Sequence, residues 1–160
     1  MNFASLKKLP ILFVCENNDY AIHSRLVDRS NQIDLYKFAE SHNIPACVVK
    51  ESNIFKLRNQ ANKIINEIRH GSGPQYLETY TYRWLEHVGP GKDWNLGYRS
   101  IDELKKWEKD DQVEILGKML TIDGRLLLEK KINKEISAAM KFAQLSPFPG
   151  KEELHKHVYK

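Results

Sequence analysis

The sequence contains few cysteines and no long apolar run among its 160 residues. Its two cysteines, Cys15 and Cys47, are too few for a disulfide framework, so a reducing compartment is the simpler expectation. No segment approaches the ~18 consecutive apolar residues that a membrane-spanning helix needs. We therefore expect a cytoplasmic protein without a membrane partner.

The N-terminal segment 1–15 imitates a secretion signal only in part. It carries two lysines, then an apolar run that ends at Cys15. That run covers only about six residues, whereas the apolar core of a signal peptide needs about 7–15. The residue before the cysteine is Val14, which is larger than a lipoprotein site accepts. We expect no secretion through this segment.

Several functional signatures are missing as well. The sequence shows no glycine-rich phosphate loop, no Ser/His/Asp triad and no zinc-spaced cysteine set. The net charge is +4 at pH 7, and opposite charges interleave, as where Lys105 and Lys106 follow Asp102 and Glu103. Interleaved charges are typical of solvated helix faces, so we expect no nucleic-acid partner.

What the sequence does contain is an alternation of strand and helix patterns. The nearly continuous apolar run at 9–15 is typical of a strand buried on both faces, as in parallel sheets. Two further strands are predicted at 44–49 and 75–82, with helices at 34–43 and 54–69 between the strands. This order predicts an α/β fold with parallel pairing and right-handed crossovers.

The remaining segments divide into loops and a helical C-terminal third. The polar segment 24–33 is predicted to be a loop, and segment 83–99, which contains Gly-Pro-Gly, a long one. Ser100 and Glu103 form a capping box at the start of a short helix. Two more helices are expected, at 111–120 and 124–145, and the prolines at 147 and 149 are expected to end the regular structure.

A polar cluster, Glu16-Asn17-Asn18, follows the first strand directly. Ligands in open α/β sheets bind beyond the carboxyl ends of the strands, where this cluster is expected to lie. An Asn amide oxygen is a hard ligand suited to Mg²⁺ or Ca²⁺. Taken alone, however, such a cluster is more often only a turn.

Three blocks of sequence resemble one enzyme family. LKKLPILFVCENNDYA (6–21) looks like the second half of a thiamine diphosphate motif, and GPQYLETYTYRWLEHVGPG (73–91) like a strand followed by an active-site loop. SPFPGKEELHKHVY (146–159) is similar to the end of the same proteins. The family is that of the alpha subunits of the decarboxylating dehydrogenase component of 2-oxo acid dehydrogenase complexes. The resemblance implies a three-layer, parallel-sheet thiamine diphosphate-binding fold.

The family's motif opens with Gly-Asp-Gly well upstream of the Asn pair, and too few residues precede Asn17 to hold it. The resemblance therefore implies the C-terminal portion of a subunit whose N-terminal half is missing. We expect a truncated or split gene product, a partial gene model or a remnant. Residues 1–99, with the active-site loop 83–99, are expected to belong to the cofactor domain, and 100–160 to a helical extension.

The resemblance also implies a metal site. In the family, the second Asn of the pair binds Mg²⁺ through its side chain, and the residue two positions later binds through its backbone carbonyl. These positions are Asn18 and Tyr20 in this sequence. Both are thus implied as metal and cofactor ligands, with Mg²⁺ held between the protein and the diphosphate. Asn17 is expected to shape the turn instead.

His87 occupies the position of the family's active-site-loop histidine, where an imidazole can bind phosphate and transfer a proton. Arg83 is a second catalytic candidate, since its guanidinium could bind a phosphate or carboxylate. It could equally pair with Glu86 and order the loop. Leu85-Glu86 departs from the family pattern, and Val88 replaces a phosphorylated serine, so regulation by phosphorylation at this site is not expected.

By resemblance, the intact enzyme decarboxylates a 2-oxo acid oxidatively and passes the product to a lipoyl group. A beta subunit is implied as partner in an α2β2 assembly, together with a lipoyl-bearing acyltransferase. The alternatives are a carboligase of the acetoin type that uses the same cofactor, and a non-catalytic remnant. This chain alone is expected to be inactive.

Overall fold

The computed structural model describes residues 1–156, and the chain divides into two compact units, Met1–Ile115 and Leu116–Lys160. The helix expected after Ser100 belongs to the first unit, together with the sheet. Each unit is described separately below, and residues 157–159 of the third family-like block lie outside the described part of the chain.

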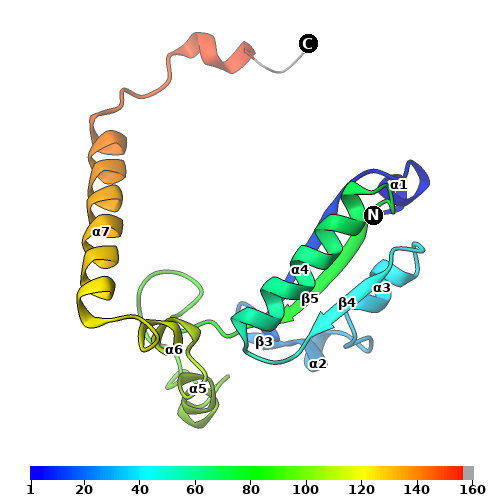
Figure 1. Cartoon of the computed structure of the whole chain (residues 1–160), viewed down its shortest axis with the longest axis horizontal. Helices are drawn as coiled ribbons and strands as arrows, with labels where there is room; N and C mark the ends of the chain where they lie inside the picture. The colour runs from blue at the N-terminus through cyan, green and yellow to red at the C-terminus, as the bar shows by residue number, and fades with distance from the viewer. Residues whose placement is uncertain (157–160) are drawn as a thin grey trace. The chain divides into compact units, whose positions relative to one another are not determined.

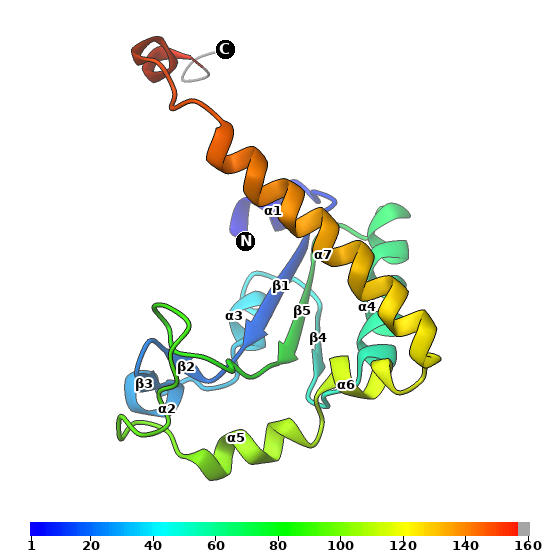
Figure 2. The same cartoon turned by 90° about the vertical axis from the view of Figure 1, so that its left-hand side faces the viewer.

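A three-stranded parallel sheet forms the centre of the first unit (Figures 1 and 2). Its strands are β1 (Leu12–Asn17), β4 (Ala46–Val49) and β5 (Gln75–Tyr80), in the order β1-β5-β4. The last strand in sequence is therefore the central one, and it pairs with both neighbours in parallel. The three predicted strands and their parallel pairing are confirmed, but their bounds differ: β1 begins later than the predicted 9–15 and includes Glu16 and Asn17, β4 begins at Ala46, and β5 ends at Tyr80.

Helices cover both faces of this sheet. Helix α4 (Ile54–Arg69) lies on one face, and its Ile64 and Ile68 pack against Leu77 of β5. Its N-terminus is capped by Asn53, whose side chain accepts a hydrogen bond from the Lys56 N–H. The three-layer α/β architecture expected from the sequence is confirmed, because a helix also covers the opposite face.

That opposite face is covered by α3 (Tyr36–Glu40), where fully buried Ala39 packs with Ile44 and Tyr76. This helix is shorter than the predicted 34–43, and its Phe38 is half exposed. Neighbouring residues of β5, Tyr76 and Leu77, thus point to opposite layers, as the alternation of side chains along a strand requires.

The prediction of a loop at 24–33 was wrong. The segment contains β3 (Ser24–Arg25), which pairs antiparallel with β2 (Tyr20–Ala21), and then α2 (Leu26–Arg29). Leu26 is 3 % exposed, and its N–H donates to the Asp19 carbonyl at 2.7 Å. Elements of two to four residues are too short to produce a periodic apolar pattern, so the sequence did not reveal them.

The other helices are α1 (Asn2–Leu6), α5 (Ile101–Glu108), α6 (Gln112–Gly117) and α7 (Ile122–Leu145). Regular structure does not end at the prolines as predicted, because a 3-10 helix follows at Lys151–His155. This helix begins directly after Gly150. The sequence did not reveal it because 3-10 helices form in short pieces that leave no periodic pattern. None of the helices in residues 1–156 is long and apolar enough to cross a membrane.

The central position of β5 makes Leu77 a test of this core. Leu77→Ala is expected to lower the free energy of unfolding by about 2–5 kcal/mol, because it leaves a cavity beneath α4. Urea unfolding followed by circular dichroism measures the change. Val14→Ala is the matched control, since Val14 is 56 % exposed on the outer strand β1; equal losses in the two variants would contradict the assigned core.

Candidate functional site

The turn after β1 is built by the two asparagine side chains. The Asn17 amide oxygen accepts from the Asp19 N–H and that of Asn18 from the Tyr20 N–H, each at 3.0 Å. Asp19 has a φ of 67°, a left-handed conformation that Asp tolerates better than most residues. The expectation that Asn17 shapes the turn is confirmed. The amide oxygen of Asn18 keeps a second lone pair available for a ligand.

A fully buried carboxyl group fixes Asn17 to the sheet. Glu78 of β5 accepts from the Asn17 side-chain amide at 2.8 Å and from the Tyr36 N–H at 3.0 Å. Each carboxyl oxygen therefore has its own donor, which offsets part of the cost of burial. The sequence did contain a signal for this group, since a Glu in a strand buried on both faces needs polar partners.

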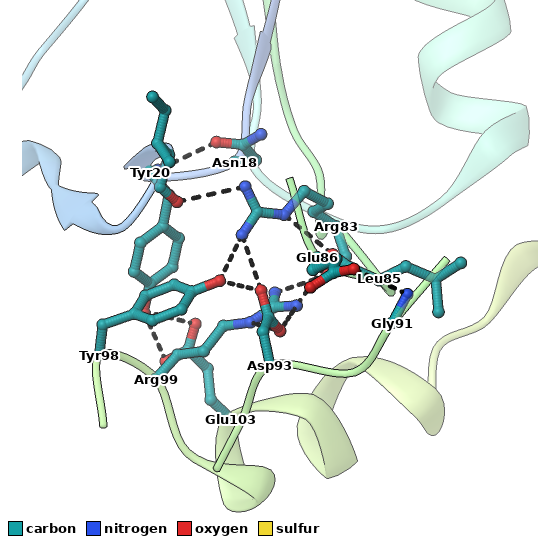
Figure 3. Close-up of polar contacts among 11 residues, drawn as sticks. Asn18, Tyr20, Arg83, Leu85, Glu86, Gly91, Asp93, Tyr98, Arg99 and Glu103 are labelled. Atoms are coloured by element: carbon teal, nitrogen blue, oxygen red, sulfur yellow. Dashed lines mark hydrogen bonds and ion pairs between the residues drawn. The ribbon is translucent and has the colours of Figure 1, made fainter. Parts of the chain in front are cut away.

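Tyr20 is held through its side chain as well as by the turn (Figure 3). Its hydroxyl donates to the Glu103 carboxylate at the start of α5, with oxygen–oxygen distances of 2.9 and 3.0 Å. Arg25, which lies opposite Tyr20 in the β2–β3 pair, also contacts Glu103, at 2.9 Å. Burial and then the neighbouring Glu103 raise the pKa of Tyr20 to about 12. The hydroxyl therefore keeps its proton at neutral pH and donates it in the hydrogen bond to Glu103.

Arg83 and Arg99 both bind the carboxylate of Asp93, which is fully buried. The Nη2 atom of Arg83 lies 3.0 Å from Asp93, and the Nε atom of Arg99 lies 2.7 Å from the other carboxylate oxygen (Figure 3). Arg83 therefore orders its loop, as one of the two alternatives expected, but through Asp93 rather than Glu86. Its binding to a phosphate or carboxylate of a ligand stays a prediction. Sequence reasoning missed Asp93 and Arg99.

The remaining donors of the two arginines fix the loop backbone. Arg83 donates to the carbonyls of Leu85 at 3.0 Å and Ile22 at 3.3 Å. Arg99 donates to the carbonyls of Arg83 at 2.6 Å and Leu85 at 3.1 Å. Ile22 has a φ of 57°, an uncommon and strained conformation for a β-branched residue. Arg83 thus donates to a carbonyl in a strained part of the backbone. The loop 83–99 is thereby attached to the β2–β3 hairpin.

Aromatic rings pack around these charges. The Arg99 guanidinium lies 5.0 Å from the centroid of the Tyr82 ring, which stacks on Trp107 and contacts Trp84 edge-on. Trp84 thus anchors the loop. The Tyr82 hydroxyl is buried and has no hydrogen-bond partner within residues 1–156. Burial also raises the pKa of Tyr82, so the ring remains neutral beside Arg99.

His87 lies at the exposed tip of the loop and is not brought to the turn. The tip is closed by Glu86, whose N–H donates to the Gly91 carbonyl at 2.9 Å and whose carboxylate accepts from the Gly91 N–H at 3.1 Å. No hydrogen bond or ion pair joins His87 to another residue in the described part of the chain. The structure therefore groups Asn18, Tyr20 and Arg83 around one edge of the sheet and leaves His87 in solvent.

The oxygens at the turn fit a hard cation only in part. Asn18 and Tyr20 offer two neutral oxygen donors, the kind that Mg²⁺ accepts beside anionic ligands. Within residues 1–156, no group of three His, Cys, Asp or Glu side chains could hold a metal ion. A cavity of about 250 Å³ at the carboxyl end of β5 is lined by Thr79–Tyr82, Trp84 and Trp107 among others, but not by Asn18, Tyr20 or His87.

The loop should depend on the charge of Asp93. Asp93→Asn is expected to lower the free energy of unfolding by about 3–5 kcal/mol, because two guanidinium groups lose their buried counter-ion. It should also increase the rate at which protease cleaves loop 83–99. Urea unfolding and limited proteolysis measure the two effects. Asp102→Asn is the control, with a side chain 82 % exposed; a parent-like Asp93→Asn would contradict the role of the buried pair.

Comparison with known proteins shows the family of this chain. The family model described as "Dehydrogenase E1 component" matches residues 1–152. The chain is 31 % identical to the pyruvate dehydrogenase E1 component subunit alpha-3 of Arabidopsis thaliana chloroplasts, over 99 % of this chain and 38 % of that protein. It is 29 % identical to the E1 alpha subunit of Rickettsia typhi (99 % and 49 %) and 31 % identical to that of Zymomonas mobilis (98 % and 45 %). It thus spans less than half of their length, and it belongs to the dehydrogenase E1 component family.

Proposed function

We propose that this chain forms, together with an upstream segment, the alpha subunit of a thiamine diphosphate-dependent 2-oxo acid dehydrogenase. The observation that carries the proposal is the turn at the carboxyl end of β1, which contains Asn18 and Tyr20. The resemblance assigns metal binding to these two positions. The intact enzyme would decarboxylate a 2-oxo acid oxidatively and transfer the product to a lipoyl acceptor. Pyruvate dehydrogenase alpha subunits are the relatives that support this reaction class.

In this proposal the Asn18 amide oxygen and the Tyr20 carbonyl bind Mg²⁺, and the metal in turn holds the diphosphate. Thiamine diphosphate, when bound, supplies the electron sink that decarboxylation needs. An anionic protein ligand is still required, and we propose that it comes from a segment that precedes the present sequence in the subunit. The short span of this chain relative to its relatives is consistent with that division.

Arg83 and His87 are proposed to act in different ways. Four of the five N–H donors of Arg83 are engaged by Asp93, Tyr98 and two carbonyls, so the residue chiefly orders the loop and one donor remains for a phosphate or carboxylate. His87 is exposed on that loop and is proposed to reach the cofactor and substrate when a partner chain covers it. Its imidazole would then hold or move a proton.

The proposed partners are a beta subunit in an α2β2 assembly and a lipoyl-bearing acyltransferase. The proposed compartment is the cytoplasm, and the proposed division of the chain is a cofactor-domain part, 1–99, and a helical extension, 100–160. Carboligation on the same cofactor is the second candidate reaction, because Leu85-Glu86 departs from the family pattern beside His87. A non-catalytic remnant remains the alternative from a different class.

Reconstitution tests the proposed activity. The purified chain with thiamine diphosphate and Mg²⁺ is expected to show no 2-oxo acid decarboxylation, since the site lacks an anionic metal ligand and much of the positioning that catalysis requires. Adding the upstream segment and a beta subunit should produce turnover, measured as CO2 release from a panel of 2-oxo acids. A correctly assembled but inactive complex would support the remnant alternative.

Two substitutions in that assembly separate metal binding from proton transfer. Asn18→Ala is expected to raise the Mg²⁺ concentration needed for cofactor binding, because it removes one oxygen ligand. His87→Ala should instead lower the rate at saturating cofactor by about 10²–10⁴, the usual effect of a lost acid or base. Joint titrations of Mg²⁺ and thiamine diphosphate measure both.

The controls are Asn95→Ala, an exposed loop asparagine, and His42→Ala, a half-buried histidine in the turn after α3. Both should titrate like the parent assembly. If Asn18→Ala also does so, the Asn pair serves only as a turn. Should His87→Ala keep the full rate, the loop histidine has no part in the reaction.

A further inference from the structure

Glu103 uses its carboxylate for a long-range contact rather than for its own helix. The Ser100 hydroxyl oxygen accepts from the Glu103 N–H at 3.3 Å, as expected of a capping box. In a complete box the Glu side chain would return to the backbone of the capping residue. Here it reaches Tyr20, 83 positions earlier in the sequence, and Arg25. The partner that a local sequence pattern predicts is thus replaced by two partners on the hairpin.

We propose that Glu103 is a positioning residue that fixes the backbone of Tyr20 and thereby the metal-binding turn. The proposal rests on the proposed function of Asn18 and Tyr20 and adds to it a residue outside the family-like motif. Glu103 would not touch the metal or the cofactor. It would act only through Tyr20 and Arg25.

The hairpin that carries Tyr20 is poorly stabilised by its own bonds. Strands β2 and β3 have two residues each, and hairpins of this size are marginal in isolation. Two flanking residues, Asp19 and Ile22, adopt left-handed backbone conformations, which are costly for residues other than glycine. The conformation of the Tyr20 carbonyl therefore depends on contacts from outside the hairpin.

Glu103 supplies such a contact to both strands at once. Tyr20 of β2 and Arg25 of β3 are direct partners in the register of the hairpin. Because one carboxylate binds both side chains, it links the two strands of the hairpin at this pair. The Glu103 side chain is 25 % exposed, so water weakens these bonds less than it would at a fully exposed site.

A second contact restricts the Tyr20 ring from the side. Tyr98 meets it edge-on, with 5.7 Å between the ring centroids, and Tyr98 comes just before α5. Figure 3 shows Tyr20 with Tyr98 beside its ring and Glu103 at its hydroxyl. Tyr98 and Glu103, which lie just before and within the first turn of α5, therefore both contact Tyr20, and Glu103 is the charged one of the two.

The first arm of the test measures the turn itself in the purified 160-residue chain. The Tyr20 N–H donates to the Asn18 side chain, so its hydrogen exchange reports on the turn directly. Glu103→Ala should speed this exchange about tenfold, the effect of losing one hydrogen bond to a charged group. Glu103→Gln keeps an acceptor for the Tyr20 hydroxyl but loses the ion pair, and should fall in between. Amide protection in β1 and β5 verifies that each variant is folded.

Asp102→Ala is the matched control, because it removes a neighbouring carboxylate from the same first turn of α5 without touching the hairpin. It should exchange like the parent chain. If Glu103→Ala and Asp102→Ala exchange alike at Tyr20, the positioning role is overturned regardless of what the enzyme does.

The second arm uses the reconstituted assembly and Mg²⁺-dependent binding of thiamine diphosphate. Glu103→Ala should raise the half-saturating Mg²⁺ concentration about tenfold, as loss of a group that orients a metal ligand does, while the rate at saturating Mg²⁺ stays within about twofold. Tyr20→Phe should raise the half-saturating Mg²⁺ concentration to a similar extent, and the double variant should need no more Mg²⁺ than either single variant. Parent-like Mg²⁺ demand in Glu103→Ala overturns the proposal, whereas a parent assembly that binds thiamine diphosphate without Mg²⁺ overturns the proposed metal site itself.

Discussion

The parallel pairing of β1 with β5 is the constraint on which the candidate site depends. Their register places Asn17 opposite Tyr80, so both strands end at the same edge of the sheet. The Thr81 N–H extends the pairing by donating to the Asn17 carbonyl at 3.0 Å. Consequently the turn at 17–20 and the loop that begins at Arg83 leave the sheet together, although more than sixty positions separate them in sequence. An antiparallel arrangement would put these two segments at opposite ends.

Buried carboxyl groups then fix the turn and the loop that the strand register places at the same edge of the sheet. Glu78 holds the Asn17 amide inside the sheet layer, and Asp93 pairs with two arginines in the loop. A buried carboxyl group without partners is costly. Conformations of the turn and loop that pair Glu78 and Asp93 are therefore favoured over conformations that leave either group unpaired. The same reasoning applies less strongly to Glu103, which is partly exposed. The site edge is therefore ordered by polar groups rather than by the apolar core.

The sequence predicted the elements that have strong patterns and missed those that depend on tertiary contacts. Helix 54–69 was found with its bounds, since its apolar residues repeat over many turns. The strands were found from their apolar or Tyr- and Thr-rich runs. The expected burial of β1 on both faces was wrong, because β1 is an outer strand with Val14 56 % exposed, and it is β5 that is buried on both faces. The β2–β3 hairpin was missed because its residues are held by Glu103 and Leu26 rather than by a local pattern. For the same reason the sequence assigned Glu103 to a capping box, and only half of that box forms.

The chemistry of the donors explains why the proposed metal site needs a ligand from a partner segment. The turn offers neutral oxygens, which bind Mg²⁺ weakly unless anionic ligands complete the shell. Three carboxyl groups that order this region are already committed: Glu78 to two N–H donors, Asp93 to two guanidinium groups and Glu103 to Tyr20 and Arg25. Releasing any of them to a metal would break the contacts that order the turn or the loop. Different carboxyl groups would therefore order the turn and bind the proposed metal. A carboxylate from another segment could complete the metal shell without disturbing the turn.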